Sequence, residues 1–546
     1  MNAGQSAAET PLSNKAKYTL VSLALVVVLF VLILSIICSY PLMSAPEVAL
    51  NLEAAKLLAT GKVPYVDFLC LSSPLVLYGC LVPLLLAQTL NIDASLASNL
   101  IAWLIALVSV MACAAILLPR RYHREWQYFP LFLVGLAVAN VLMLFQVGQA
   151  EHLAVMLFMP YFLVRWLRWN GHAVSRREAM LSGAFAAIGF CLWQSILLIG
   201  AGLEVFWLLS IRRFHPLLAL EVRASVCTAS FCLLVALALP EAARTSYLSL
   251  VYPMLSLGYQ CHDWSIYGMG SVPERRDIFY LGLAAIVFSL PFRRRTTLAG
   301  PLVVMFLVGF GLYLSQLKGL SQSAIPMIFS TTLLLSINLG IVGTLVLRLR
   351  KAPRFYKAVL SVYAVSVLLP AGLFLKQQEN KISRGLPLVA EMMMLSSDEP
   401  ANSASWLSMY SRENDEVMFL TDSLQPGYPL VLQMKRKPSG YLLQSDFLVQ
   451  LEACERESLE PKKFEQYAEP IYRRLAQDIE ARRAKMIFVQ DVTIDDLLKK
   501  HKVAETLLKN YELKGHARLH GANQEPVERT GFNYNIGVYL PRGQSQ

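Results

Sequence analysis

Apolar segments about twenty residues long recur along most of this chain, and short basic tracts separate them. The first runs from about 18 to 41, and the others fall near 71–90, 96–118, 127–146, 153–168, 180–194, 196–211, 218–240, 278–292, 298–315, 325–347 and 358–375. About 20 apolar residues are what a helix needs to cross a bilayer. Only 16% of the residues are charged, against roughly a quarter in soluble domains. The chain is therefore predicted to be a mostly α-helical, polytopic membrane protein.

The basic tracts predict the topology. They lie between the apolar segments, at 120–124, 176–177, 212–213, 293–295 and 348–351. Cytoplasmic loops carry an excess of Lys and Arg, so these tracts are expected on the cytoplasmic side. The net charge of +11 thus reports orientation in the membrane, and no nucleic-acid partner is predicted.

All of these basic tracts lie on the same side of the membrane only if one early apolar segment does not cross it. Segment 71–90 is the choice, because it contains Pro74 and Pro83 and follows a polar loop. It is expected to lie at the outer face, which leaves about eleven transmembrane helices. A single kinked helix over 180–211 is the alternative, and it would reverse everything that follows.

This count predicts three regions. Residues 1–17 form a cytoplasmic tail, and 18–375 form the transmembrane domain, with juxtamembrane helices in a first outer loop at 42–95. Residues 376–546 form a small extracytoplasmic α/β domain. Its strands are predicted at 416–421, 485–490 and 532–540, with helical spacing over 461–484 and 492–510.

Ionisable residues concentrate in the outer loops. The spans hold few, chiefly Glu204, Glu221 and Arg223 near predicted ends. A transporter keeps polar groups at mid-membrane, so chemistry at the outer face is favoured over the alternative of a lipid or polysaccharide transporter or polymerase. Nine cysteines show no metal-binding spacing, and no disulfide framework is predicted.

Three outer-loop motifs carry a family resemblance. They are GKVPYVDF at 61–68 behind a predicted helix at 46–59, GQAEHLAVMLFMPY at 148–161, and QLKG at 316–319 with Pro326. Together they resemble the GT-C glycosyltransferases, in particular bacterial relatives of protein O-mannosyltransferases and lipid A aminoarabinose transferases. The resemblance implies a multi-pass protein of the bacterial inner membrane. It would move a sugar from a polyprenyl-phosphate donor, with inversion, to a glycan, lipid or protein acceptor.

The resemblance also implies roles for residues. Glu47 would be the general base, Glu151 with His152 a second acidic site, and Lys318 the partner of the phosphate. Other candidates for binding substrate or phosphate are Tyr65, Asp67, Gln316, Arg275 and Arg276. A divalent cation, Mg²⁺ or Mn²⁺, would be held by Glu151 and His152.

The chain departs from the family pattern at Ala45 and Pro46, where an acidic residue is usual, and at Ser72 and Ser73, where a lysine is common. A non-catalytic protein of the same architecture is therefore the first alternative. Without the resemblance, Glu47 reads as a helix N-terminal residue that complements the dipole, and Asp67 as a turn residue. Glu53 and Lys56 read as the solvated face of an amphipathic helix.

Overall fold

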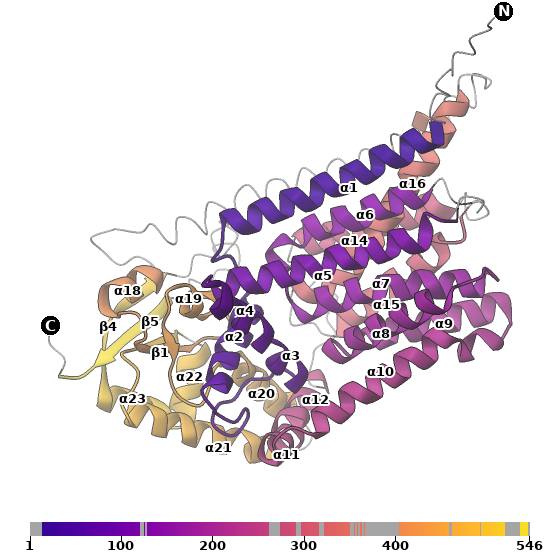
Figure 1. Ribbon diagram of the computed structural model, residues 1–546. Coiled ribbons are helices and arrows are strands. Elements are labelled where there is room, and N and C mark those ends of the chain that lie inside the picture. The colour runs from indigo at the N-terminus through magenta and orange to yellow at the C-terminus, as the bar shows by residue number, and fades with distance from the viewer. Residues whose placement is uncertain are drawn as a thin grey trace, which may run out of the picture.

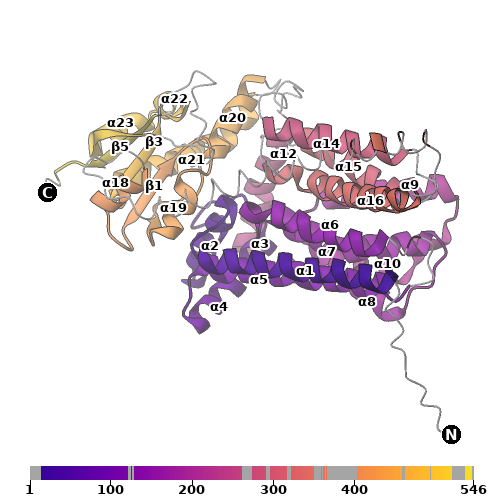
Figure 2. The same ribbon diagram turned by 90° about the horizontal axis from the view of Figure 1, so that it is seen from above.

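The computed structural model describes residues 14–120, 125, 128–260, 273–290, 296–315, 321–349, 403–457, 461–491, 493–518 and 535–543, with a few single positions between 354 and 365. A helical bundle carries an α/β domain at one end (Figures 1 and 2). We call this end the outer end and the opposite one the inner end, following the predicted topology. Helix α1 begins at the inner end and runs toward the α/β domain (Figure 1).

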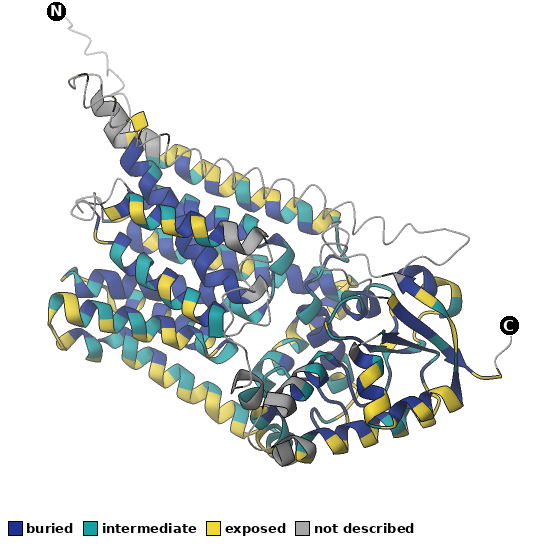
Figure 3. Ribbon diagram, turned by 180° about the vertical axis from the view of Figure 1, so that it is seen from behind, coloured by how far each residue is buried: buried dark blue, intermediate teal, exposed yellow. Residues whose placement is uncertain are grey.

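The bundle is built from apolar helices. They are α1 (Asn14–Ser39), α5 (Ala94–Leu117), α6 (Phe129–Leu142), α7 (Ala150–Trp169), α8 (Arg176–Leu192), α9 (Ile196–Ile211), α10 (Leu220–Leu237), α14 (Pro273–Ser289), α15 (Ala299–Ser315) and α16 (Ile325–Leu349). Within the described residues, 5 helices are long and apolar enough to cross a membrane, namely α1, α5, α7, α10 and α16. Large apolar side chains such as Phe231, 64% exposed, lie on the surface of the bundle, where lipid would cover them. Figure 3 shows exposed positions along the outward faces of the bundle helices. The count of about eleven spans stays a prediction, and the last segment, 358–375, lies largely outside the described residues.

The segment 180–211 is a helical hairpin and not one kinked helix. Near its outer end, Gly189 of α8 comes so close to α7 that a Cβ there would lie 2.9 Å from the Ala154 carbonyl oxygen. Helix α9 then returns along α7, and Trp207 stacks on Trp169 at the inner end with ring centroids 6.3 Å apart. The basic start of α8 also lies at the inner end, where Glu178 pairs with Arg120 at 3.1 Å.

A buried ion cluster ties three helices together at the inner end. Arg165 of α7, 1% exposed, makes two 2.7 Å hydrogen bonds to Glu204 of α9 and one of 2.9 Å to Glu221 of α10. Arg168 reaches the same Glu221 at 3.2 Å, and the Trp169 indole N–H donates to Glu204. Buried charges are tolerated at membrane depth only when paired, and each of these is.

The first outer loop folds into three juxtamembrane helices: α2 (Pro46–Ala59), α3 (Pro74–Gly79) and α4 (Leu81–Leu90). The predicted helix at 46–59 is confirmed. Segment 71–90 is broken at Cys80 into helices of 6 and 10 residues, neither long enough to span alone. The expectation of a solvated face at Glu53 was wrong, because Glu53 is only 2% exposed and pairs with Lys56 at 2.7 Å. Burial, opposed by Lys56, raises the Glu53 pKa.

The C-terminal domain is an α/β fold, as predicted. Its sheet has the order β2-β1-β3-β5-β4 and consists of β1 (Glu416–Leu420), β2 (Lys437–Pro438), β3 (Met486–Gln490), β4 (Tyr511–Arg518) and β5 (Asn535–Pro541). β1 pairs in parallel with β2 and β3, and β5 pairs antiparallel with β3 and β4. The helices are α18 (Ser403–Tyr410), α19 (Gly427–Gln433), α20 (Asp446–Glu457), α21 (Pro461–Glu480), α22 (Thr493–Lys500) and α23 (Val503–Asn510).

Two details of this domain differ from the prediction. Strand β4, with the sequence YELKGHAR, was missed because its charged residues and glycine hide the alternation of an edge strand. The predicted helix at 492–510 is two helices, because Lys502 adopts a left-handed conformation with φ of 58° between them.

A second outer segment joins α10 to the site region through α11 (Glu241–Ser246), a π-helix (Tyr247–Val251) and α12 (Tyr252–Gln260). The Tyr247 ring packs on Tyr65 of the first outer loop, with centroids 5.3 Å apart. Both outer segments therefore lie against the C-terminal domain (Figure 1).

Reporter fusions test the topology. Fusions after Arg176 and Arg294 should read cytoplasmic, and a fusion after Gln377 should read extracytoplasmic, because the basic tracts favour the cytoplasmic side. Paired alkaline phosphatase and green fluorescent protein reporters measure this. A cytoplasmic signal after Gln377 would contradict the model.

The ion cluster makes a prediction about stability. Arg165→Ala leaves Glu204 without its bidentate partner and should cost about 3–5 kcal/mol, the usual effect of removing one member of a buried pair. Thermal unfolding of the purified protein in detergent measures this loss. Arg223→Ala, an exposed arginine two residues from Glu221, is the matched control and should unfold like the wild type; equal melting of the two variants would contradict the account.

Candidate functional site

The candidate site lies at the outer end, where segments distant in sequence meet. The first turn of α2 brings Glu47, and the start of α7 brings Glu151. Residues 69–72 of the first outer loop form one side of the site. Residues 441–446 of the C-terminal domain lie against them, through a parallel bridge between Leu69 and Leu442.

Glu47 and Glu151 are brought together by a tight turn before α7. Gly148 has a φ of 85°, which glycine adopts without strain. A Cβ at this position would lie 3.5 Å from Cγ2 of Val48, the neighbour of Glu47. The two carboxylates lie close enough to repel each other. The Oε2 atom of Glu151 is inaccessible to water and has no hydrogen-bond partner within the described residues.

A polar cluster surrounds the buried thiol of Cys70. The Ser72 hydroxyl donates to Oδ1 of Asn51 at 2.5 Å, and the Cys70 sulfur lies 3.5 Å from Oγ of Ser72. The sulfur also lies 3.9 Å from Asn51 Oδ1 and 4.0 Å from Oε1 of Gln444. Two elements of the first outer loop and one segment of the C-terminal domain therefore share this cluster.

The charges around Cys70 come from both domains. Burial raises the pKa of the Cys70 thiol to about 11; hydrogen bonding with Ser72 opposes this, and the negative charges of Glu47 and Asp446 add to it. The thiol therefore stays protonated at neutral pH. It follows that Asp446 lies within electrostatic reach of the residues around Glu47.

Tyr65 and Asp67 hold the shape of the first outer loop. Tyr65 is buried, and its hydroxyl donates to the Ser72 carbonyl at 2.7 Å, while its own carbonyl accepts from the Tyr441 hydroxyl at 3.1 Å. Asp67 is exposed and accepts from the Val63 amide at 2.7 Å, which fixes the turn. The structure places Tyr65 between the two domains and Asp67 at the loop surface.

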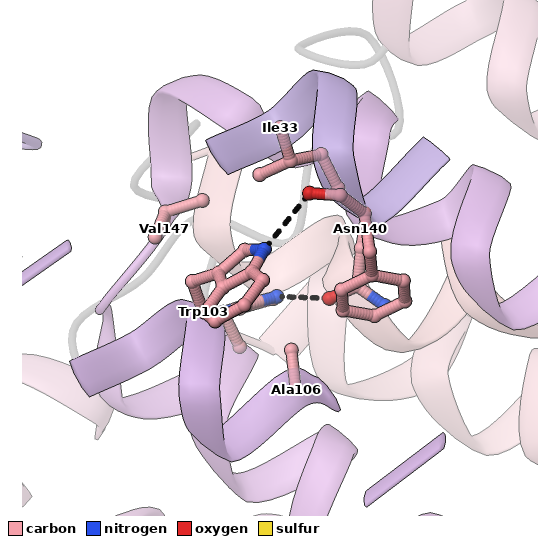
Figure 4. A pocket seen from close by; sticks show the side chains of 7 residues that line it. Ile33, Trp103, Ala106, Asn140 and Val147 are labelled. Atoms are coloured by element: carbon pink, nitrogen blue, oxygen red, sulfur yellow. Dashed lines mark hydrogen bonds between the residues drawn. The ribbon is translucent and has the colours of Figure 1, made fainter. Parts of the chain in front are cut away.

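His152 turns away from Glu151 and into the bundle. It is 1% exposed, and its Nε2 lies 3.0 Å from Oδ1 of Asn140. It lines a small apolar cavity together with Trp103, whose indole N–H donates to the carbonyl of Phe30 at 3.0 Å (Figure 4). Glu151 and His152 are neighbours in sequence but serve different surroundings.

The remaining candidates cannot be placed in the site. Gln316 and Lys318 lie outside the described residues. Arg275 and Arg276 belong to the first turn of α14, but the structure describes only their backbone. No group of three or more His, Cys, Asp or Glu side chains in the described part of the chain is arranged to hold a metal ion.

The sequence reasoning missed four residues of the site. They are Asn51, Ser72, Gln444 and Asp446. Asn51 and Ser72 lie inside the regions that the motifs singled out, but no spacing rule marks them. Gln444 lies just before α20 and Asp446 is its first residue, and only the docking of the two domains brings this segment against the first outer loop.

Comparisons with known proteins find similar solved structures, which include two glycosyltransferases. No protein-family model and no curated protein matches the chain. A crystal structure of ArnT from Cupriavidus metallidurans bound to undecaprenyl phosphate shares 11% identity, covers 96% of this chain and 98% of that chain, and has a TM-score of 0.44. A cryo-EM structure of the arabinofuranosyltransferase AftD from mycobacteria shares 13% identity and has a TM-score of 0.36. The match covers 94% of this chain and 39% of that chain.

Both neighbours are membrane glycosyltransferases of the GT-C fold, the family that the loop motifs resemble. At these TM-scores neither likeness supports an assignment of residues or substrates. The argument for function therefore rests on the chain's own loops and their geometry.

The turn before α7 provides a test of the geometry. Gly148→Ala puts a side chain at a positive φ, which should cost about 1 kcal/mol, and relief of this strain should shift the turn that positions Glu151. Gly171→Ala is the matched control, since Gly171 has a φ of 79° with nothing near its Cβ position. Both variants should lose similar stability in thermal unfolding, but only Gly148→Ala should lower sugar transfer per folded molecule. Equal transfer by the two variants would contradict a role for this turn in the site.

Proposed function

We propose that the protein is a membrane glycosyltransferase that takes a sugar from a polyprenyl-phosphate donor and passes it to an acceptor hydroxyl at the outer face of a bacterial inner membrane. The observation that carries this proposal is the meeting of Glu47 and Glu151 at the outer end of the bundle. A polyprenyl donor cannot leave the bilayer, so its transferase has to hold the reactive carbon at the membrane surface. Glu47 and Glu151 lie at the end of the bundle where the predicted topology puts the outer membrane surface.

In the proposed reaction, Glu47 is the general base. The acceptor oxygen attacks C1 of the sugar, the bond between C1 and the phosphate oxygen breaks, and the acceptor proton passes to the Glu47 carboxylate. The lipid phosphate leaves with the electron pair of the broken bond, and the configuration at C1 inverts. Glu151 lies beside Glu47, and the repulsion between two such carboxyl groups favours protonation of one of them.

The leaving phosphate gains negative charge and needs a cationic partner. The loop motif at 316–319 makes Lys318 the candidate for this role. A divalent cation remains a proposal from the resemblance alone, and no step above depends on it.

Loss of the proposed base tests the function. Glu47→Gln keeps the shape and hydrogen bonding of the side chain but cannot accept a proton, so transfer should fall by at least about a hundredfold, the usual scale for a lost general base. Release of undecaprenyl phosphate from undecaprenyl-phosphate-linked monosaccharides, with a membrane extract as the acceptor source, measures the turnover. Thermal stabilisation by undecaprenyl phosphate should be unchanged.

Glu241→Gln is the matched control, because Glu241 also lies in the first turn of an outer-face helix and is exposed. It should retain wild-type transfer. Near-normal transfer by Glu47→Gln would mean that Glu47 only complements the dipole of α2. Donor binding without any transfer by the wild type would favour the non-catalytic alternative.

A further inference from the structure

The segment 441–446 is held rigidly against the first outer loop. The Leu69 amide donates to the Tyr441 carbonyl at 2.6 Å, and the Leu443 amide donates to the Leu69 carbonyl at 3.2 Å. The Ser445 hydroxyl accepts from the Thr421 amide at 2.7 Å and donates to the Thr421 carbonyl at 2.8 Å. This segment is thereby fixed both to the first outer loop and to the end of β1.

The place of this segment in the sheet matches where α/β folds bind ligands. The connection after β1 leads to β2 on one side, while the chain returns to β3 on the other side. Ligands of open α/β sheets bind at the carboxyl ends of strands where the order reverses in this way. Residues 421 and 444–446 lie at that edge, and the edge faces the first outer loop through Gln444 and Cys70.

From this placement we infer that Gln444 and Asp446 form the acceptor side of the site that contains Glu47, and that the acceptor is a hydroxyl-rich glycan without negative charge. The inference rests on the proposed function. It goes further by assigning the C-terminal domain a part in substrate selection.

The chemistry of the surrounding groups gives the acceptor class. Glu47, Glu151 and Asp446 supply carboxylates from three separate elements, and Asn51 and Gln444 supply amide oxygens. These oxygens accept hydrogen bonds from hydroxyl groups. The negative charges of Glu47 and Asp446 repel a phosphate or carboxylate on the acceptor, because like charges raise the energy of the complex.

A buried atom supports a polar ligand at this place. Oε2 of Glu151 is inaccessible to water and lacks a donor within the described part of the chain. A buried oxygen without a donor is costly and rare in folded proteins. A sugar hydroxyl bound beside Glu47 would supply the missing hydrogen bond.

Acceptor saturation with the full-length protein tests the inference. The probes are neutral gluco-, galacto- and manno-oligosaccharides and their monophosphate esters, with an undecaprenyl-phosphate-linked sugar as donor. The wild type should use a neutral oligosaccharide and not its phosphate ester. Asp446→Asn should raise the KM for that acceptor about tenfold, the scale of one lost charged hydrogen bond. Its kcat should stay within about twofold, and its KM for the donor should not change.

Asp495→Asn is the matched control, because Asp495 belongs to the same domain and pairs with Lys499 at 2.6 Å on α22, outside the site. It should behave like the wild type. An Asp446→Asn variant with an unchanged acceptor KM would overturn the inference, as would a wild type that prefers the phosphate ester. A variant that only melts earlier, with wild-type KM, would reduce Asp446 to a structural role and also overturn it.

A binding measurement separates this inference from the proposed function. The neutral oligosaccharide alone should raise the melting temperature of the wild type and of Glu47→Gln, but not that of Asp446→Asn. If the wild type neither transfers sugar nor is stabilised by undecaprenyl phosphate, the proposed function fails. The change in melting temperature with the oligosaccharide still decides whether the C-terminal domain binds a glycan. If the oligosaccharide does not raise the melting temperature of the wild type, the inference is refuted.

Discussion

The contact between the first outer loop and the C-terminal domain is the interaction on which the rest of the structure depends. A short parallel bridge at Leu69 and Leu442 joins the two domains, and the Gln433 side chain donates to the Leu42 carbonyl at 2.9 Å. Buried apolar residues of the loop, such as Leu52 and Phe68, belong to the same core as those of the domain. Burial of apolar surface favours this docking, and the main-chain bonds fix its register. The loop that carries Glu47 is therefore held in one shape by a domain more than three hundred residues away in sequence.

The ionisable side chains at the two ends of the bundle have opposite kinds of neighbour. At the inner end Arg165 lies between Glu204 and Glu221, and every charge of the cluster has an opposite partner. At the outer end the carboxyl groups of Glu47 and Glu151 lie close enough to repel each other when both are ionised. Oppositely charged pairs hold helices together. Two carboxylates close together in a partly desolvated site raise the free energy of the folded state and raise each other's pKa. The inner end thus serves stability, and the outer end has the electrostatics of a reactive site.

The residues that the sequence motifs singled out have different roles in the structure. Glu47 and Glu151 come close together at the outer end of the bundle. His152 follows Glu151 directly, yet the helical rotation of about 100° per residue turns it toward Asn140 inside the bundle. Asp67 belongs to the clearest motif, but its carboxylate is used in a turn at the surface. A motif identifies a loop, whereas the direction of each side chain depends on what packs around it.

The sequence by itself determined that the chain is a membrane protein, where the helix 46–59 lies, and that the C-terminal region is an α/β domain. These follow from hydropathy, periodicity and turn residues, which act over a few neighbouring positions. Only the tertiary structure decided that Glu53 is buried, that 180–211 is a hairpin, and that Gln444 and Asp446 lie near Cys70 of the first outer loop. Each of these depends on contacts between different segments of the chain. A local sequence pattern does not specify which distant segment will pack against it.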